Sequence, residues 1–119
     1  QKTTKVAVQK GVVRQKTDFI VGPNGLTIPT NRNILETGFK NAGFQASPTR
    51  SAGMQYIIPN QNMKVRVMES TWHAPLRASF EHIKGGPINP FTGRPPTAPL
   101  GIENRALYLR QQTHMELYQ

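Results

Sequence analysis

The stretch at residues 53–69 reads GMQYIIPNQNMKVRVME, and it decides the fold class. Two strand-like runs flank the turn-forming letters PNQN, which is the composition and spacing of a β-hairpin. Strand side chains alternate between two faces, so Val65 and Val67 share one face while Lys64 and Arg66 share the other. The pattern therefore predicts a sheet with one apolar face and one polar face.

The segments around this hairpin complete an α+β pattern. A helix is expected at 31–44, a third strand at 76–83, a long Pro/Gly loop at 85–101, a short helix at 102–112 and a fourth strand at 113–118. Strands that follow one another, with helices set apart, are typical of an antiparallel sheet covered on one side. We expect an N-terminal helix packed on a four-stranded antiparallel sheet.

The helix at 31–44 carries its own end signals. Asn31 or Asn33 is a suitable N-cap, because an Asn side chain accepts from the exposed amides of the first turn. Gly43 is a suitable C-cap, because glycine adopts positive φ without a steric cost. Gly38 weakens the helix from within.

The first 30 residues are predicted to lie outside the packed domain. Residues 1–17 are basic and polar, and residues 18–30 contain the turn signal GPNG and end near Pro29. We therefore expect residues 1–30 to be a partly ordered linker and junction peptide, and 31–119 to be a single domain. The chain begins with Gln, and we expect it to be a piece of a longer protein.

The composition is strongly basic and lacks cysteine. Fifteen Lys and Arg residues against six Asp and Glu give a formal net charge of +9. A small domain of this charge usually meets a polyanion: a nucleic acid, an anionic membrane or an acidic protein. The absence of Cys excludes disulfides, zinc–thiolate sites and thiol nucleophiles. No apolar run approaches the ~20 residues of a membrane span.

Strand parity gathers polar side chains on the open face of the predicted sheet. They are Lys64, Arg66, Arg77, Ser79, Glu81, His114 and Glu116. Cleavage of RNA without a metal needs a general base for the 2′-hydroxyl, a general acid for the leaving oxygen and a cation for the charge on phosphorus. Histidine can act as acid or base because its ordinary pKa is about 6.5. The same pattern is also that of any sheet with one solvated face, on which Glu81 and Glu116 would only pair with Arg77 and Arg66.

Motifs for metal and cofactor chemistry are absent from the sequence. There is no HExxH, no EF-hand loop, no phosphate-binding GxxxxGK[ST] and no GxSxG. Asp18 is the only Asp, whereas two-metal nucleases need several carboxylates. We therefore expect no metal and no cofactor.

Four stretches resemble bacterial polymorphic toxins. DFIVGPNGLTIPT (18–30) is similar to the junction peptide before C-terminal toxin domains, and KVRVMES (64–70), APLRASFEHIKGGPINPFTGRPP (74–96) and RQQTHMELY (110–118) resemble the toxin modules of contact-dependent inhibition, Rhs and LXG proteins. The resemblance implies delivery, as part of a larger secreted or cell-surface protein, into the cytoplasm of a neighbouring bacterium. It also implies a cognate immunity protein, which we expect to be acidic. Many such modules are RNases, often tRNases, with the barnase, EndoU, colicin nuclease and RelE fold, whose open sheet face cuts RNA.

The function expected from the sequence is that of a metal-independent RNase toxin domain acting on tRNA. The expected roles are His114 as general acid or base, Arg66 and Arg77 as ligands of the scissile phosphate, Ser79 as a ligand of a phosphate oxygen and Glu81 as a base or as a residue that orients an arginine. The base stays open between Glu81, Glu116 and a neutral histidine.

Further residues are expected to hold the substrate, with the 85–101 loop as a rim. They are Lys64, Lys84, Arg94, Thr113 and His73, the last of which could equally be an ordinary loop residue. The alternatives are a DNase or another enzymatic toxin class, and a non-catalytic basic module that binds nucleic acid. Whether a host factor takes part stays open.

Overall fold

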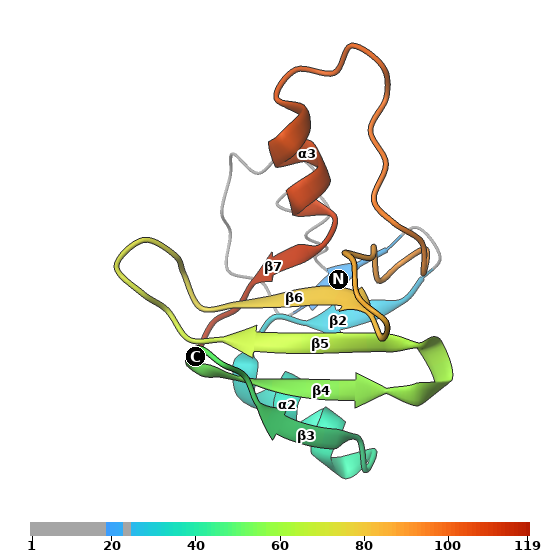
Figure 1. Cartoon of the computed structure of the whole chain (residues 1–119). Coiled ribbons are helices and arrows are strands. Elements are labelled where there is room, and N and C mark those ends of the chain that lie inside the picture. Colours follow the sequence, from blue (N-terminus) through green and yellow to red (C-terminus); the bar gives the residue numbers. More distant parts are fainter. Residues whose placement is uncertain (1–18, 23–24) are drawn as a thin grey trace.

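The computed structural model of the chain describes residues 19–22 and 25–119. The α+β class is confirmed (Figure 1), because an antiparallel sheet and separate helices make up the fold. The linker expected at residues 1–17 lies outside the described residues.

In the described part of the chain the main sheet has five strands in sequential order, each antiparallel to the next. They are β3 (Gln45–Pro48), β4 (Gly53–Ile58), β5 (Met63–Met68), β6 (Arg77–His82) and β7 (His114–Glu116). A 3-10 turn, η1 (Pro59–Gln61), connects β4 to β5. The prediction of four strands was wrong, because β3, with the sequence QASP, pairs with β4 along its whole length.

The covered face of the sheet holds the core. The predicted apolar parity is confirmed, since Val65, Val67 and Phe80 are buried there. Helix α2 (Arg32–Asn41) packs on this face through buried Leu35. Within the described part of the chain, no helix covers the opposite face of β4, β5 and β6 (Figure 1).

The ends of α2 match their sequence signals. The Asn31 side chain accepts a hydrogen bond from the Ile34 amide at 3.0 Å, so Asn31 is the N-cap. The helix ends at Asn41 with Ala42 as its C-cap, and Gly43, predicted as the C-cap, follows one position later with φ of 78°, a conformation that favours glycine.

The segment expected to be a junction peptide forms part of the packed body. Strands β1 (Phe19–Val21) and β2 (Thr27–Pro29) pair as an antiparallel hairpin, and Ile20 and Ile28 are buried in the core. The expectation that this segment lies outside the core was therefore wrong, and α2 is preceded by a hairpin. Alternation is too short in a three-residue strand to be distinguished from a loop. The linker at residues 1–17 stays a prediction.

The chain after β7 ties the sheet to the β2–α2 junction. The Leu117 amide donates to the Leu76 carbonyl at 2.9 Å, and the Tyr118 amide donates to the Thr30 carbonyl at 2.8 Å. The Tyr118 carbonyl in turn accepts from the Arg32 amide at 2.7 Å. The C-terminal segment therefore connects the start of β6 to the end of β2 and the start of α2 through backbone hydrogen bonds.

The long loop after β6 is packed at its start and ends at helix α3 (Arg105–Gln111). Ile88 is buried, and its amide donates to the Phe80 carbonyl at 3.1 Å. Farther along, the Gln112 side chain donates to the Thr97 carbonyl at 2.6 Å and accepts from the Thr97 amide at 3.2 Å. The predicted short helix is confirmed, and it stands beside β7 at the edge of the sheet (Figure 1).

Candidate active site on the open face of the sheet

A row of four polar side chains crosses the middle of the open face. Gln55 of β4 pairs with Arg66 of β5, Arg66 pairs with Ser79 of β6, and Ser79 pairs with His114 of β7. Residues directly opposite in antiparallel strands project from the same face. Three inter-strand spacings put the whole row within about 15 Å. The structure thus brings together Arg66, Ser79 and His114, as strand parity predicted.

A carboxylate organises the cationic part of this row. One oxygen of Glu81 lies 3.5 Å from Lys64 Nζ, and the other lies 3.4 Å from Arg66 Nε. Arg66 Nε also donates to Gln55 Oε1 at 3.3 Å. Glu81 therefore holds two cations side by side. Glu81 thus forms an ion pair with an arginine, as the alternative of a solvated face predicted, but the arginine is Arg66 and Lys64 is a second partner.

His114 is held through one ring nitrogen. Its Nδ1 lies 2.9 Å from Thr113 Oγ1 and 3.3 Å from the Arg110 carbonyl oxygen. The Thr113 hydroxyl itself donates to the same carbonyl at 3.2 Å. Because a carbonyl only accepts, we assign the proton of the neutral ring to Nδ1. Nε2 then carries the lone pair, and it makes no hydrogen bond to any residue that the structure describes.

The surroundings of His114 favour this neutral form. Burial of the ring lowers its pKa, and the charges of Arg110 and Arg77 lower it further, while the hydrogen bond to the Arg110 carbonyl opposes them. The ordinary value is 6.5, so the ring is neutral at neutral pH. A neutral imidazole with an accepting Nε2 is a general base.

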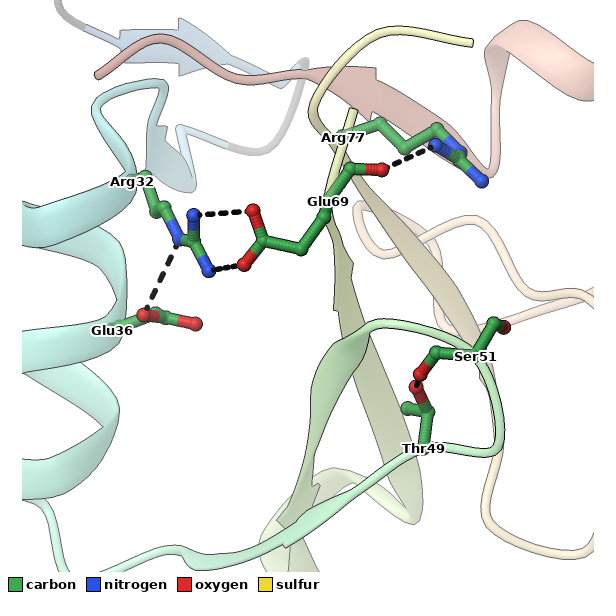
Figure 2. A network of polar contacts seen from close by, with 6 residues as sticks. All are labelled: Arg32, Glu36, Thr49, Ser51, Glu69 and Arg77. Atoms are coloured by element: carbon green, nitrogen blue, oxygen red, sulfur yellow. Dashed lines mark hydrogen bonds and ion pairs between the residues drawn. The ribbon is translucent and has the colours of Figure 1, made fainter. Parts of the chain in front are cut away.

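Arg77 lies in the row next to that of His114 but is tied to the β5–β6 loop. Its register partners are Met68 and Glu116. One guanidinium nitrogen of Arg77 donates to the Pro75 carbonyl at 2.9 Å and to the Glu69 carbonyl at 3.3 Å. Figure 2 shows the second of these contacts. Arg77 therefore acts on His114 through its charge and holds the loop through its hydrogen bonds.

The remaining predicted substrate ligands lie away from the central row. Lys84 follows the end of β6, where its amide donates to His82 Nδ1 at 3.1 Å. Arg94 closes the turn that begins at Asn89 in the long loop. His73 lies in the exposed β5–β6 loop.

Thr113 does not face solvent. It is buried, and its hydroxyl contacts the Arg110 carbonyl and His114 Nδ1. The prediction that Thr113 contacts the substrate was therefore wrong. Its parity is that of Met115 and Leu117 on the covered face, so it reaches the site only through His114.

Two contributors were missed from the sequence. Gln55 occupies the end of the row, and it could have been found by pairing the two strands of the 53–69 hairpin residue by residue. The Arg110 carbonyl that orients His114 had no signal in the sequence, because every residue carries a carbonyl.

Residues 19–22 and 25–119 contain no group of three or more His, Asp and Glu side chains able to hold a metal ion. No helix in these ranges is long and apolar enough to cross a membrane. Comparisons with protein-family models, with curated proteins and with solved structures give no match.

Proposed function

We propose that the chain is an RNase toxin domain that cleaves RNA without a metal ion, and that its substrate is tRNA. The observation that supports this most is the row Arg66–Ser79–His114, in which a neutral histidine presents an accepting Nε2 in the same row as a cation. A surface that only binds nucleic acid needs cations, but it needs no oriented, neutral imidazole.

In the proposed reaction His114 is the general base. Nε2 takes the proton of the 2′-hydroxyl, and the 2′-oxygen attacks the adjacent phosphorus. The new 2′-O–P bond forms as the P–O5′ bond breaks. The products are a 2′,3′-cyclic phosphate and a 5′-hydroxyl, whose oxygen receives its proton from solvent, and His114 returns its own proton to solvent.

The neighbouring side chains supply charge and position. Arg66 stabilises the negative charge that develops on the phosphate oxygens, and the Ser79 hydroxyl between Arg66 and His114 donates to one of those oxygens. Glu81 is engaged in two ion pairs, so we assign it the role of positioning Lys64 and Arg66. The role of general base is assigned to His114.

The biological context is part of the same proposal. Its support is the resemblance of the sequence to polymorphic toxin modules and the net charge of +9. The domain would be delivered as part of a larger protein, act in the cytoplasm of the target cell and be blocked by a cognate acidic immunity protein. Charge complementarity would speed the association of that inhibitor with the toxin.

The test is the digestion of total bacterial RNA in EDTA, with analysis of the fragment ends. We expect the wild type to give discrete tRNA fragments with 2′,3′-cyclic phosphate ends, and His114→Ala to give none. His82→Ala is the matched control, because His82 has the opposite parity at the end of β6 and should leave cleavage unchanged.

Two results would contradict the proposal. RNA left intact by the wild type in EDTA would contradict the proposed metal-independent reaction. A parallel incubation with DNA and Mg²⁺ would then test the DNase alternative. Equal cleavage by wild type and His114→Ala would support the RNase activity but show that His114 is not its general base. Circular dichroism of each variant establishes that it is folded.

A further inference from the structure

The β5–β6 loop, residues 69–76, displays the only tryptophan of the chain. Trp72 is 94% exposed, whereas the other aromatic side chains in the described ranges are buried or half-buried. A tryptophan left in water contributes nothing to the core, although its ring offers more apolar surface than most side chains. An exposed ring of this kind is available to stack on a flat partner.

The exposed ring is displayed on a defined turn. The Thr71 amide donates to the Ala74 carbonyl at 2.8 Å, and the Ala74 amide donates back to the Thr71 carbonyl at 3.4 Å. Trp72 and His73 lie between these two hydrogen bonds. Their rings meet edge to face, with centroids 4.7 Å apart and an interplanar angle of 64°.

Both legs of the loop are braced from the body of the protein. Arg77 donates to the carbonyls of Glu69 and Pro75, one on each leg. The Glu69 carboxylate accepts two hydrogen bonds from Arg32 at the start of α2, and Arg32 also pairs with Glu36 at 3.6 Å (Figure 2). The turn is thus held in place before any ligand arrives, which lowers the entropic cost of binding.

From these contacts we infer that Trp72 and His73 form a stacking platform for an unpaired nucleobase that lies beyond the two nucleotides joined by the scissile bond. The inference rests on the proposed RNase function and adds a second contact to the substrate. Flat aromatic rings stack on any base, and the positive charge of the protein attracts the phosphate backbone of the RNA. Arg77 connects the platform to the central row, because it donates a hydrogen bond to the β5–β6 loop and lies in the row next to that of His114.

The geometry separates the platform from the chemistry. Arg77 and Ser79 are two positions apart on an extended strand, which is about 7 Å, and the turn lies farther out. The chain between Trp72 and Ser79 can span at most ~25 Å. A longer single strand can therefore occupy both the central row and the platform, and we expect a dinucleotide on the central row not to reach the platform.

Cleavage of two substrates tests this separation. We expect Trp72→Ala to lower kcat/KM on a single-stranded RNA of about ten nucleotides by between about 5-fold and 150-fold, the range measured for the loss of one base stack. Cleavage of a dinucleotide should stay at the wild-type rate, and Trp72→Phe should retain most of the activity on the longer RNA. Ile34→Ala is the matched control, because Ile34 is another exposed apolar side chain, at 60%, and it lies on α2, which packs on the covered face of the sheet.

Fluorescence gives a readout that needs no turnover. The chain has one Trp, so its emission reports on this site alone. An RNA of the same length with 2′-O-methyl riboses cannot be cleaved, and we expect it to quench the emission saturably, while a dinucleotide does not. Binding is followed in parallel by the anisotropy of a labelled copy.

The platform would be excluded by binding without quenching, or by equal cleavage of the longer RNA by wild type and Trp72→Ala. Equal losses on both substrates would also overturn it, because the substitution would then act on the fold or on Arg77. A wild type that cleaves neither RNA contradicts the proposed function instead, and the quenching titration still decides whether Trp72 meets a base.

Discussion

His114 shows how local contacts can select one protonation state of a side chain. The Arg110 carbonyl and the Thr113 hydroxyl occupy Nδ1, so the ring presents Nε2 to the open face. Burial and the neighbouring arginines lower the pKa of the ring. A base with a lowered pKa is already deprotonated in mildly acidic solution, and this sets the expected pH dependence.

We predict that kcat/KM for RNA cleavage rises with pH and levels off, with its midpoint below 6.5. The active form is the neutral ring, and activity is lost as the pH falls through the lowered pKa. Arg110→Gln keeps the backbone carbonyl but removes a charge that lowers the pKa, so the midpoint should move to higher pH. Initial rates measured on a dinucleotide from about pH 4 to about pH 8 would show both effects. A rate that falls with rising pH over this range would make His114 an acid instead.

Thr113 offers a second test at the same ring. Thr113→Val removes the hydroxyl and keeps a similar volume in a buried position. We expect kcat to fall by about 5-fold to 30-fold, because one hydrogen bond of about 1–2 kcal/mol no longer orients the imidazole. KM should not change, since Thr113 does not face the substrate. An unchanged kcat would show that the Arg110 carbonyl alone fixes the ring.

At the scale of elements, two glycines make opposite predictions for the same substitution. Gly38 lies inside α2 with nothing near the position of an added Cβ, so Gly38→Ala should raise the free energy of unfolding by about 0.5–1 kcal/mol. A Cβ on Gly22 would lie 2.1 Å from the Phe91 ring, so Gly22→Ala should lower it by about 1–3 kcal/mol. Urea unfolding measures both, and a loss of stability in Gly38→Ala would contradict the stated environment of that helix position.

The ion pair between Arg32 and Glu69 joins α2 to the β5–β6 loop and should respond to pH. The hydrogen bonds from Arg32 lower the pKa of Glu69. The stabilisation is therefore present above the ordinary value of 4.5 and is lost as the pH falls through the folded-state pKa. We expect Glu69→Gln to unfold about 0.5–1 kcal/mol more easily than the wild type near neutral pH.

At low pH the wild type and Glu69→Gln should have equal stability, because both side chains are then neutral. Glu103→Gln is the control, since Glu103 is exposed and has no ion pair within the described ranges. A constant difference between wild type and Glu69→Gln at all pH values would mean that the pair contributes by packing and not by charge.

The elements differ in how far their sequences predict them. The 53–69 hairpin follows from its turn and its composition, the faces of β5 follow from strict alternation, and α2 follows from Asn31, its apolar spacing and Gly43. By contrast, QASP at residues 45–48 has no alternation, and it is a strand because β4 offers it an edge. In the candidate site, parity placed Arg66, Ser79 and His114 on one face, but the ties of Arg77 to the loop depend on tertiary contacts that no local pattern encodes.

Over the whole molecule, the charge of +9 should govern RNA affinity through salt. Each phosphate contact on a single strand contributes about −0.7 to the slope of log K against log salt. If Lys84 and Arg94 hold the backbone, Lys84→Gln and Arg94→Gln should each make the slope shallower by about 0.7. Anisotropy with a 2′-O-methyl RNA measures this, with Glu103→Gln as the control for an exposed side chain. An unchanged slope would show that the substituted residue does not contact an RNA phosphate.

The order of the strands also has a consequence for biosynthesis. The sheet is built from neighbours in the chain from β3 to β6, but β7 joins it only after residues 83–113 have been made. A chain that grows from its N-terminus can therefore complete four strands, with Arg66 and Ser79 in place, while the position of His114 is still empty. Under the proposed function, a ribosome would carry an inert nascent domain throughout elongation of these strands, and the tRNAs that serve it would be exposed to cleavage only after the last strand has docked.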